Sequence, residues 1–497
     1  MVEVMVLGVA VLIPVSAVMV LVRVLKFFVF EHFRSSESPD AQIVKGQVVV
    51  RGINLWAGAN FNPAKSFRAN EDQSLASNSW CHLPEDLVID QILPRLPVKS
   101  LMRFKSVCKG WHALLSTRSF IASHLKYIDT PKRLVSWNGN NNGLIVGHDA
   151  FHVFTECCYT RNYQPVNLNF GFDRKPDLVL GPCDGLFCLY WRANSMFTFF
   201  NEVEVNVERL PTIALWNPAT RAFSILPMSN FDFPPYRKAA YCMVGFGFDL
   251  TTRSIKVVKV LTLSRAEVCQ FDFINCAEVY DLGSGSWRIL HLPDMVKDVV
   301  VDDELIVSMY NKNDGLFHWR CQRRQKYRDD DEVVLSFDMS TELFHVTPLP
   351  DKYNEYRLDL DRWKECNFAL LGDSLALIYS FFDWPYLDDK GHTTVEVWVM
   401  KDFDCVVEAG ESLSSYSYSH ELTLEPRLPG LCVSTGFWNK NELLIWKDVV
   451  NDEWRVGRSP FLYDIVTKQV RDVEISGELN FMYRESLVSV KGGCGNE

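Results

Sequence analysis

The sequence lacks the short motifs that mark common enzyme active sites. It contains no Gly-x-Ser-x-Gly nucleophile motif, no His-Glu-x-x-His zinc motif and no phosphate-binding loop, and its eleven histidines form no convincing constellation. A basic surplus is missing too, because the net charge is −11, which argues against binding nucleic acid through its phosphates. We therefore expect no enzyme, no cofactor and no nucleic-acid partner.

Paired cysteines are missing as well. The fourteen cysteines include no Cys-x-x-Cys pair. Residues of metal-binding type cluster once, in a segment that alternates like a strand, so we expect no metal there; they are His148, His152, Cys157 and Cys158. Cys183 and Cys188 lie in apolar runs, where cysteine acts as a small buried hydrophobic residue. This usage is typical of a reducing compartment and predicts a location in the cytoplasm or nucleus.

A long uncharged run occupies the N-terminus. Residues 4–22 are nineteen residues without a charge, enough for a helix of about 28 Å, and Arg23, Lys26 and Arg34 follow them. One interpretation of residues 1–30 is a signal-anchor that leaves the following chain on the cytosolic side of a membrane. The alternatives are an atypical extension and a cleaved signal peptide. Residues 31–80 are expected to form a flexible linker.

Helical spacing appears after residue 82. Leu83-Pro84 favours a helix start, because proline needs no hydrogen bond in the first turn, and the carboxylates of Glu85 and Asp86 suit the positive end of the helix dipole. Pro94 and Pro97 limit this first helix. A second, amphipathic helix is predicted from apolar residues three or four apart: Val98, Leu101, Phe104, Val107, Cys108, Trp111, Leu114 and Leu115. Residues 120–125 predict a third short helical segment.

Downstream of residue 130 the helical period disappears and one phrase recurs. An apolar strand ends in an Asn or Asp turn and a second strand follows; these turn residues are 57 to 64 positions apart, at Asn217, Asp281, Asp338, Asp402 and Asp464. A second turn phrase falls between them, at residues 184–187, 314–319, 372–377 and 441–444. Four strands in about 60 residues make one propeller blade. The predicted fold class is therefore α plus all-β, with a small helical region before a β-propeller-like domain of roughly six blades at residues 130–490.

Residues 81–127 resemble an F-box. The Leu83-Pro84 start, the blocks at residues 95–101 and 103–109, and Trp111 occur in this order in plant F-box proteins. The resemblance implies that this surface docks on the Skp adaptor of a Skp-cullin-F-box ubiquitin ligase. The positions that match the family's contact pattern are Leu83, Pro84, Leu96, Pro97, Leu101, Phe104, Val107, Cys108 and Trp111.

The repeats resemble the plant F-box-associated interaction domain, a kelch-like group that includes the S-locus F-box proteins. The phrases at residues 181–186, 215–221, 244–249 and 436–438 carry this resemblance. The double glycines of true kelch repeats are absent from residues 130–490, since Gly492-Gly493 in the tail is the only such pair, and the pairing of Gly-His with Trp-Asp that marks WD40 repeats is absent too. Two segments depart from the pattern, Arg320 to Glu332 and Ser412 to His420. We interpret both as loops that recognise a target, because propeller function resides in loops.

These features predict a substrate adaptor without catalytic residues. The F-box would bind Skp and, through it, cullin, while the propeller would bind an unidentified target protein for ubiquitylation and proteasomal degradation. The alternative is a membrane-tethered or ligase-independent protein-interaction scaffold. An enzyme on a propeller scaffold is disfavoured by the missing motifs.

Overall fold

The computed structural model describes the chain in segments. They are residues 42–44, 47–50, 53–55, 88–127, 133–137, 151–155, 164–165, 176–192, 211–229, 234, 237–265, 273–300, 307–323, 331–350, 362–383, 391–401, 406–408, 411–413, 417–450, 456–473 and 479–491. The chain forms two compact units, Met1–Arg95 and Leu96–Glu497. Each unit has its own secondary structure.

The first unit contains a small sheet and two helical turns among its described residues. Strands β1 (Gln42–Val44), β2 (Gln47–Val50) and β3 (Ile53–Leu55) pair antiparallel inside the range predicted as a linker. A π-helical turn η2 (Val88–Ile92) and a 3-10 helix η3 (Leu93–Arg95) follow. The uncharged run at residues 4–22 lies outside the described residues, and no helix among those described is long and apolar enough to cross a bilayer.

The second unit begins with three helices, and here one expectation is wrong. The helices are α4 (Val98–Phe104), α5 (Lys109–Leu114) and α6 (Arg118–Tyr127). The stretch predicted as one amphipathic helix is thus broken in two. Cys108 adopts an extended conformation (φ −157°, ψ 164°), and its Sγ accepts a hydrogen bond from the backbone N of Trp111 at 3.4 Å. The thiol therefore caps a new helix where the apolar spacing alone indicated continuity.

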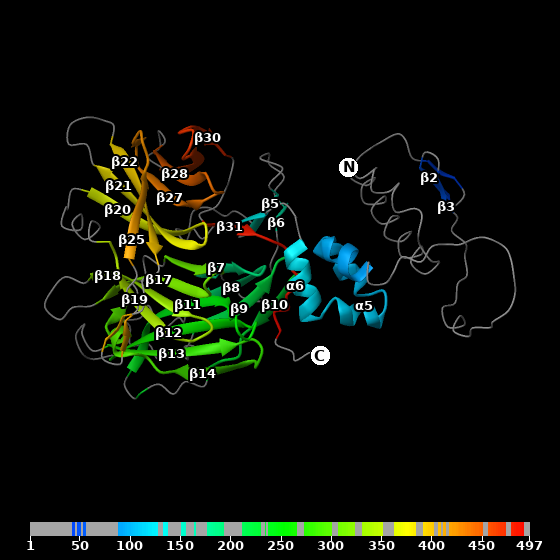
Figure 1. Cartoon of the computed structure of the whole chain (residues 1–497), viewed down its shortest axis with the longest axis horizontal. Helices are drawn as coiled ribbons and strands as arrows, with labels where there is room; N and C mark the ends of the chain where they lie inside the picture. The colour runs from blue at the N-terminus through cyan, green and yellow to red at the C-terminus, as the bar shows by residue number, and fades with distance from the viewer. Residues whose placement is uncertain are drawn as a thin grey trace, which may run out of the picture. The chain divides into compact units, whose positions relative to one another are not determined.

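Antiparallel sheets of four or five strands follow (Figure 1). Five of them use consecutive stretches of chain. Blade 1 comprises β7 (Leu178–Cys183), β8 (Leu186–Trp191), β9 (Thr212–Asn217) and β10 (Ala222–Ile225). Blade 2 comprises β11 (Arg237–Phe248), β12 (Ile255–Arg265), β13 (Phe273–Asp281) and β14 (Ser286–Leu290). Blade 3 comprises β15 (Val299–Val300), β16 (Ser308–Asn311), β17 (Leu316–Arg323), β18 (Asp331–Asp338) and β19 (Phe344–Pro348), after the short helix α7 (Asp294–Lys297).

Two further blades and a closing sheet complete the domain. Blade 4 comprises β20 (Arg362–Leu371), β21 (Ser374–Asp383), β22 (His392–Lys401), β25 (Ser417–Thr423) and β26 (Leu428–Pro429), with the separate hairpin β23 (Val406–Glu408) and β24 (Glu411–Leu413) between β22 and β25. Blade 5 comprises β27 (Cys432–Phe437), β28 (Glu442–Val450), β29 (Val456–Asp464) and β30 (Val470–Asp472). The closing sheet joins β31 (Leu479–Tyr483) to β4 (Arg133–Trp137), β5 (Phe151–Thr155) and β6 (Gln164–Pro165).

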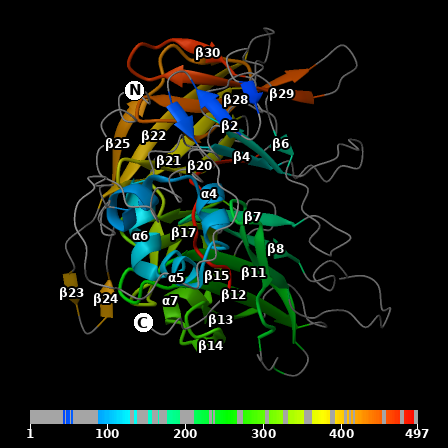
Figure 2. The same cartoon turned by 90° about the vertical axis from the view of Figure 1, so that its right-hand side faces the viewer.

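Neighbouring sheets contact each other through a strand at one edge of each sheet. β31 contacts β7, β7 contacts β11, β11 and β16 meet, and β20 contacts both β16 and β27. In Figure 2 the colours pass from green in blades 1 and 2 through yellow in blade 4 to orange in blade 5. Radial contact of this kind is the arrangement of a propeller. The β-propeller-like fold is therefore confirmed, with five blades of consecutive strands where roughly six were predicted, and with the closing sheet joining the two ends of the domain.

The repeated Asn and Asp residues close turns, as their spacing predicts. Each side-chain Oδ1 accepts a hydrogen bond from the backbone N two residues later, at the turn before the last strand of a blade. The pairs are Asn217 with Ala219 (3.0 Å), Asp281 with Gly283 (2.7 Å), Asp338 with Ser340 (2.7 Å) and Asp464 with Val466 (2.8 Å). Asp402 lies outside the described residues. Because first-to-second and third-to-fourth turns lie at the same end of an antiparallel sheet, these turns gather on one face of the propeller, which we call the Asx face.

Two glycines of β11 set the spacing between blades 2 and 3. A Cβ at Gly245 would lie 2.5 Å from the Trp319 ring, and one at Gly247 would lie 2.5 Å from the Tyr310 ring. Tyr310 also donates its hydroxyl to the carbonyl of Phe248 at 3.0 Å. The alternating glycines therefore let aromatic rings of blade 3 pack directly on the backbone of blade 2.

Candidate partner-binding surfaces

The predicted F-box contact residues differ in exposure. Leu101 is fully buried, so its role is packing, whereas Val107 and Cys108 are exposed. Leu83 and Pro84 lie outside the described residues. The remaining predicted positions are half-buried: Leu96, Pro97, Phe104 and Trp111. The structure thus shows a mixed apolar surface on α4 and α5, on which the side chain of Leu101 is not exposed.

An aromatic pair connects α4 to α5. The rings of Phe104 and Trp111 meet edge to face, with centroids 5.4 Å apart and an interplanar angle of 77°. Two large apolar side chains beside them face solvent, Met102 at 37% and Val107 at 47% exposure. Met102 was not predicted from the sequence as a contact residue. Its position directly after the buried Leu101 places it outside the apolar stripe of the helix, which is the signal that could have indicated its exposure.

A buried histidine supports this helical region. His124 on α6 is buried, and its Nε2 lies 3.0 Å from the carbonyl oxygen of Leu96. Burial lowers the pKa of His124, and the hydrogen bond to Leu96 opposes that shift only in part. The contact ties α6 to the residue just before Pro97. Nothing in the local sequence indicated this role, because the two partners are separated by a turn and two helices.

The first candidate target loop is wrong at both of its ends. Arg320 lies in β17 and Glu332 in β18, and both are buried. Arg320 Nε donates to Glu332 Oε2 at 2.8 Å, and its Nη1 reaches the carbonyl of Cys366 in blade 4 at 3.4 Å. The charges that suggested an exposed insertion form a buried ion pair within blade 3, and Arg320 alone reaches blade 4. Residues 324–330 lie outside the described residues.

The second candidate target loop is also corrected. Ser412 belongs to β24, and residues 417–420 belong to β25, which pairs with β22 as a strand of blade 4. His420 packs edge to face on Trp398, with ring centroids 5.2 Å apart. The Ser/Tyr composition suggested a loop, but alternating polar side chains also suit a strand with one exposed face.

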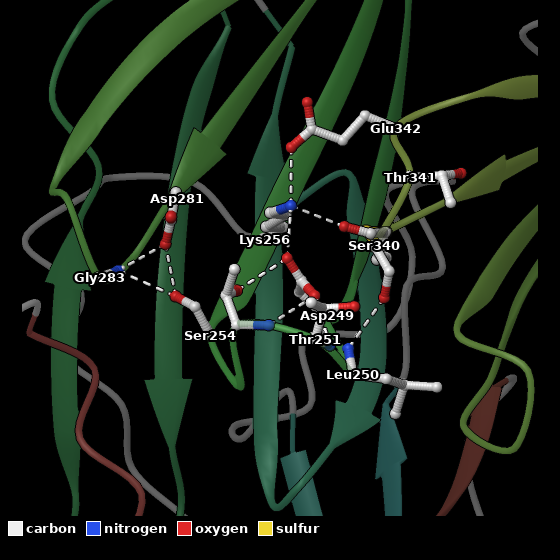
Figure 3. A network of polar contacts seen from close by, with 12 residues as sticks. Asp249, Leu250, Thr251, Ser254, Lys256, Asp281, Gly283, Ser340, Thr341 and Glu342 are labelled. Carbon is white, nitrogen blue, oxygen red and sulfur yellow. Dashed lines mark hydrogen bonds and ion pairs between the residues drawn. The ribbon is translucent and has the colours of Figure 1, made fainter.

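Buried charges join blades 2 and 3 on the Asx face (Figure 3). Lys256 Nζ lies 2.6 Å from Asp249 Oδ2 and 2.7 Å from Glu342 Oε1, and it donates to the carbonyl of Met339 at 2.7 Å. Burial would raise the pKa of Asp249, but hydrogen bonds from Lys256 and Thr252 hold it below its usual value. Lys256 therefore bonds at the same time to the turn after β11 in blade 2 and to the turn after β18 in blade 3.

Other polar side chains of the Asx face also bond within the domain. Lys312 of blade 3 pairs with Asp184 of blade 1. Asn313 Nδ2 donates to Asp373 Oδ1 in blade 4 at 2.8 Å. These contacts hold neighbouring turns together, so the chemistry of this face serves the fold.

Six of the eight free cysteines of the described residues are buried. Cys183 and Cys188 are 1% and 0% exposed, which confirms that they are packing residues. Burial raises the pKa of Cys183 and of Cys188, so both remain thiols at neutral pH. Of the tempting cluster at residues 148–158, only the backbone of His152, in β5, falls within the described residues.

Comparison with known families agrees with this architecture. Residues 180–490 match the F-box associated beta propeller domain, and residues 80–123 match the F-box domain. The chain belongs to the family of F-box proteins with this propeller. The F-box match ends within α6, and the propeller match begins in blade 1, so the two matched regions correspond to the helical and β parts described above.

Relatives in Arabidopsis thaliana carry the same description. The chain is 26% identical to a protein called putative F-box only protein 15 over 53% of this chain and 57% of the relative. It is 25% identical to a putative F-box protein over 59% of this chain and 73% of the relative. It is 26% identical to an F-box/kelch-repeat protein over 67% of this chain and 79% of the relative. The match thus spans little more than half the length of the first of these relatives.

Proposed function

We propose that this F-box protein is a substrate-recognition subunit of a Skp-cullin-F-box ubiquitin ligase. The F-box binds the Skp adaptor and, through it, cullin, and the propeller binds a target protein for ubiquitylation and proteasomal degradation. The observation that carries the proposal is the exposed apolar surface of α4 and α5, with Met102 and Val107 beside the pair Phe104 and Trp111. Exposed apolar side chains around half-buried aromatic anchors are typical of a protein interface.

The role requires no catalytic group in this chain. Holding the ligase at one domain and the target at another raises the effective concentration of the target's lysines near the transfer machinery. A propeller suits the second task because its strands are fixed by packing while its connections vary. The Asx face uses its polar side chains within the domain, so we place target binding at the opposite face, where second strands connect to third strands.

The Skp contact is assigned to specific positions. Leu96, Pro97, Phe104, Cys108 and Trp111 are half-buried or exposed and match the family's contact pattern. We give Leu101 a packing role in this proposal, because its side chain is buried. Met102 and Val107 complete the surface. Leu83 and Pro84 remain predicted contacts from the resemblance alone.

Loss of central anchors should remove Skp binding. We expect Trp111→Ala, and separately Leu96→Ala with Pro97→Ala, to abolish co-purification of a recombinant Skp adaptor, since truncating a central anchor costs about 2 kcal/mol or more, roughly thirtyfold in Kd. Val107→Asp should do the same with less effect on stability, because Val107 is already 47% exposed. Binding is measured by biolayer interferometry.

A matched control separates contact from folding. Val466→Asp places the same change at a side chain that is 68% exposed in the last turn of blade 5, and it should leave Skp affinity unchanged. Thermal unfolding confirms that each variant is folded. Wild-type affinity for Skp in all three F-box variants would falsify the proposed contact, and no binding by the wild-type chain would remove the ligase role.

A further inference from the structure

Helices α4, α5 and α6 have an unusual charge distribution. The chain as a whole carries a net charge of −11, yet residues 96–127 contain no Asp or Glu. The same stretch contains six basic residues: Lys99, Arg103, Lys105, Lys109, Arg118 and Lys126. A compact positive region in an acidic protein produces a local field that attracts negative surfaces.

Helix stability does not explain two of these charges, those of Lys109 and Arg118, whereas Lys126 lies in the last turn of α6, where a cation suits the helix dipole. Lys109 is the first residue of α5, and Arg118 is the first residue of α6. The free backbone N–H groups at a helix start carry partial positive charge, so a cation there is unfavourable. Lys109, Arg118 and Lys126 are exposed, and none forms an ion pair within the described part of the chain. Their charge is therefore available to a partner.

The surroundings favour a protein partner. Met102 lies on α4 and Val107 lies between α4 and α5, and both expose apolar side chains. A surface for phosphate groups needs no exposed apolar side chains, whereas a protein interface combines an apolar centre with a charged rim. Charges at such a rim act mainly on the rate of association.

We propose that Lys109, Arg118 and Lys126 steer an acidic face of the Skp adaptor onto the apolar F-box surface. This inference rests on the proposed function. The apolar anchors set the lifetime of the complex, and the basic residues set the rate at which it forms. Steering by exposed charges weakens as salt screens them, over a distance of about 10 Å at 0.1 M salt.

The test is the association rate constant of the full chain with a recombinant Skp adaptor, measured by stopped flow at several salt concentrations. For the wild type we expect it to fall about tenfold from low to high salt. Lys109→Gln, Arg118→Gln and Lys126→Gln combined should slow association about three- to tenfold at low salt, flatten the salt dependence and leave the dissociation rate within about twofold. The triple variant should fold normally, because glutamine at the starts of α5 and α6 removes two unfavourable charges, which offsets the favourable charge of Lys126 that is lost from the last turn of α6.

A control with equal charge change isolates the F-box. Arg253→Gln, Lys440→Gln and Lys468→Gln combined change exposed residues of the propeller and should leave association unchanged. Skp binding with a salt-independent association rate, or with the same rate in the triple variant, overturns the steering while leaving the ligase role intact. Capture of phosphatidylserine vesicles by the wild type but not by the triple variant, with Skp kinetics unchanged, would assign the charges to a membrane instead. No Skp binding by the wild type overturns the ligase role itself.

Discussion

At Gly247 a single missing atom lets two blades meet. The Tyr310 ring occupies the space that a Cβ would need, and its hydroxyl is held by the carbonyl of Phe248. The ring therefore has little freedom to move aside. The same relation joins Gly245 to Trp319, whose Nε1 donates to the carbonyl of Val244 at 3.0 Å.

Adding a methyl group at Gly247 should destabilise the propeller. We expect Gly247→Ala to lower the free energy of unfolding by about 1–3 kcal/mol, because the new Cβ would lie 2.5 Å from Tyr310 Cε2 and 3.0 Å from Met339 Cε. Gly110→Ala is the control, since a Cβ there meets only Cys108 Sγ at 3.9 Å, and alanine favours the helix. Denaturant unfolding measures both. Equal stability of the Gly247 variant and wild type would mean that the ring yields easily.

At the scale of the strands, blade 3 places a polar row inside the domain. The register aligns His318 of β17 with Ser336 of β18 and His345 of β19. His318 is 1% exposed, and its Nδ1 lies 2.8 Å from Ser336 Oγ. Burial, with a smaller contribution from His345, lowers the pKa of His318 to about 3. The histidine is therefore neutral in the folded protein throughout the physiological range.

This row should make stability fall with mild acid. In the unfolded chain His318 takes a proton below its ordinary pKa of 6.5, whereas in the folded chain it does so only near pH 3, so stability is lost as pH falls below 6.5. Between pH 7.5 and 5.5 we expect His318 to reduce the free energy of unfolding by about 1 kcal/mol. His318→Gln should flatten the decline by that amount, measured by denaturant unfolding at each pH. His112→Gln, at an exposed position, should leave it as in the wild type; an unchanged decline in the His318 variant would contradict the assignment.

At the scale of the whole molecule, the C-terminal segment fastens the domain. β31 pairs with β4, and the chain then passes blade 1, where Asn217 Nδ2 donates to the carbonyls of Ser486 (3.1 Å) and Val488 (2.8 Å). Figure 1 shows the end of the chain, in red, next to the green strands of blade 1. The side chain that forms the Asx turn of blade 1 is thereby held by residues about 270 positions later in the chain. The first blade therefore depends on the last residues of the fold.

Removing this segment should weaken the entire propeller. Truncation after Tyr483 removes the buried Leu487 and Val490 and two acceptors of Asn217, so we expect the free energy of unfolding to fall by roughly 3–6 kcal/mol. Thermal unfolding should show one cooperative transition at a lower Tm. Ser489→Ala, at an exposed position of the same segment, should change the free energy of unfolding by less than about 0.5 kcal/mol. An unaltered Tm after truncation would show that the fastening is dispensable.

Local features of the sequence determined the repeat and the helical region. An Asx turn needs one side chain and the two backbone N–H groups that follow, so the spacing of Asn217, Asp281, Asp338 and Asp464 could be read as blades before any contact was known. The F-box pattern likewise lies in consecutive residues. For these features, the residues that form the structure and the residues that indicate it in the sequence lie within a few positions of each other.

Only the tertiary structure decided how those pieces use their side chains. Cys108 caps α5, Leu101 is buried within the helical region, and Arg320 pairs with Glu332 inside blade 3 rather than lining a loop. Each outcome depends on which faces meet when the blades and helices pack, and composition gives the same signal for a solvated charge and a buried ion pair. The sequence by itself therefore specified the secondary-structure elements and their period. The packing of the sheets into a closed ring determined which side chains stabilise the fold and which stay exposed to partners.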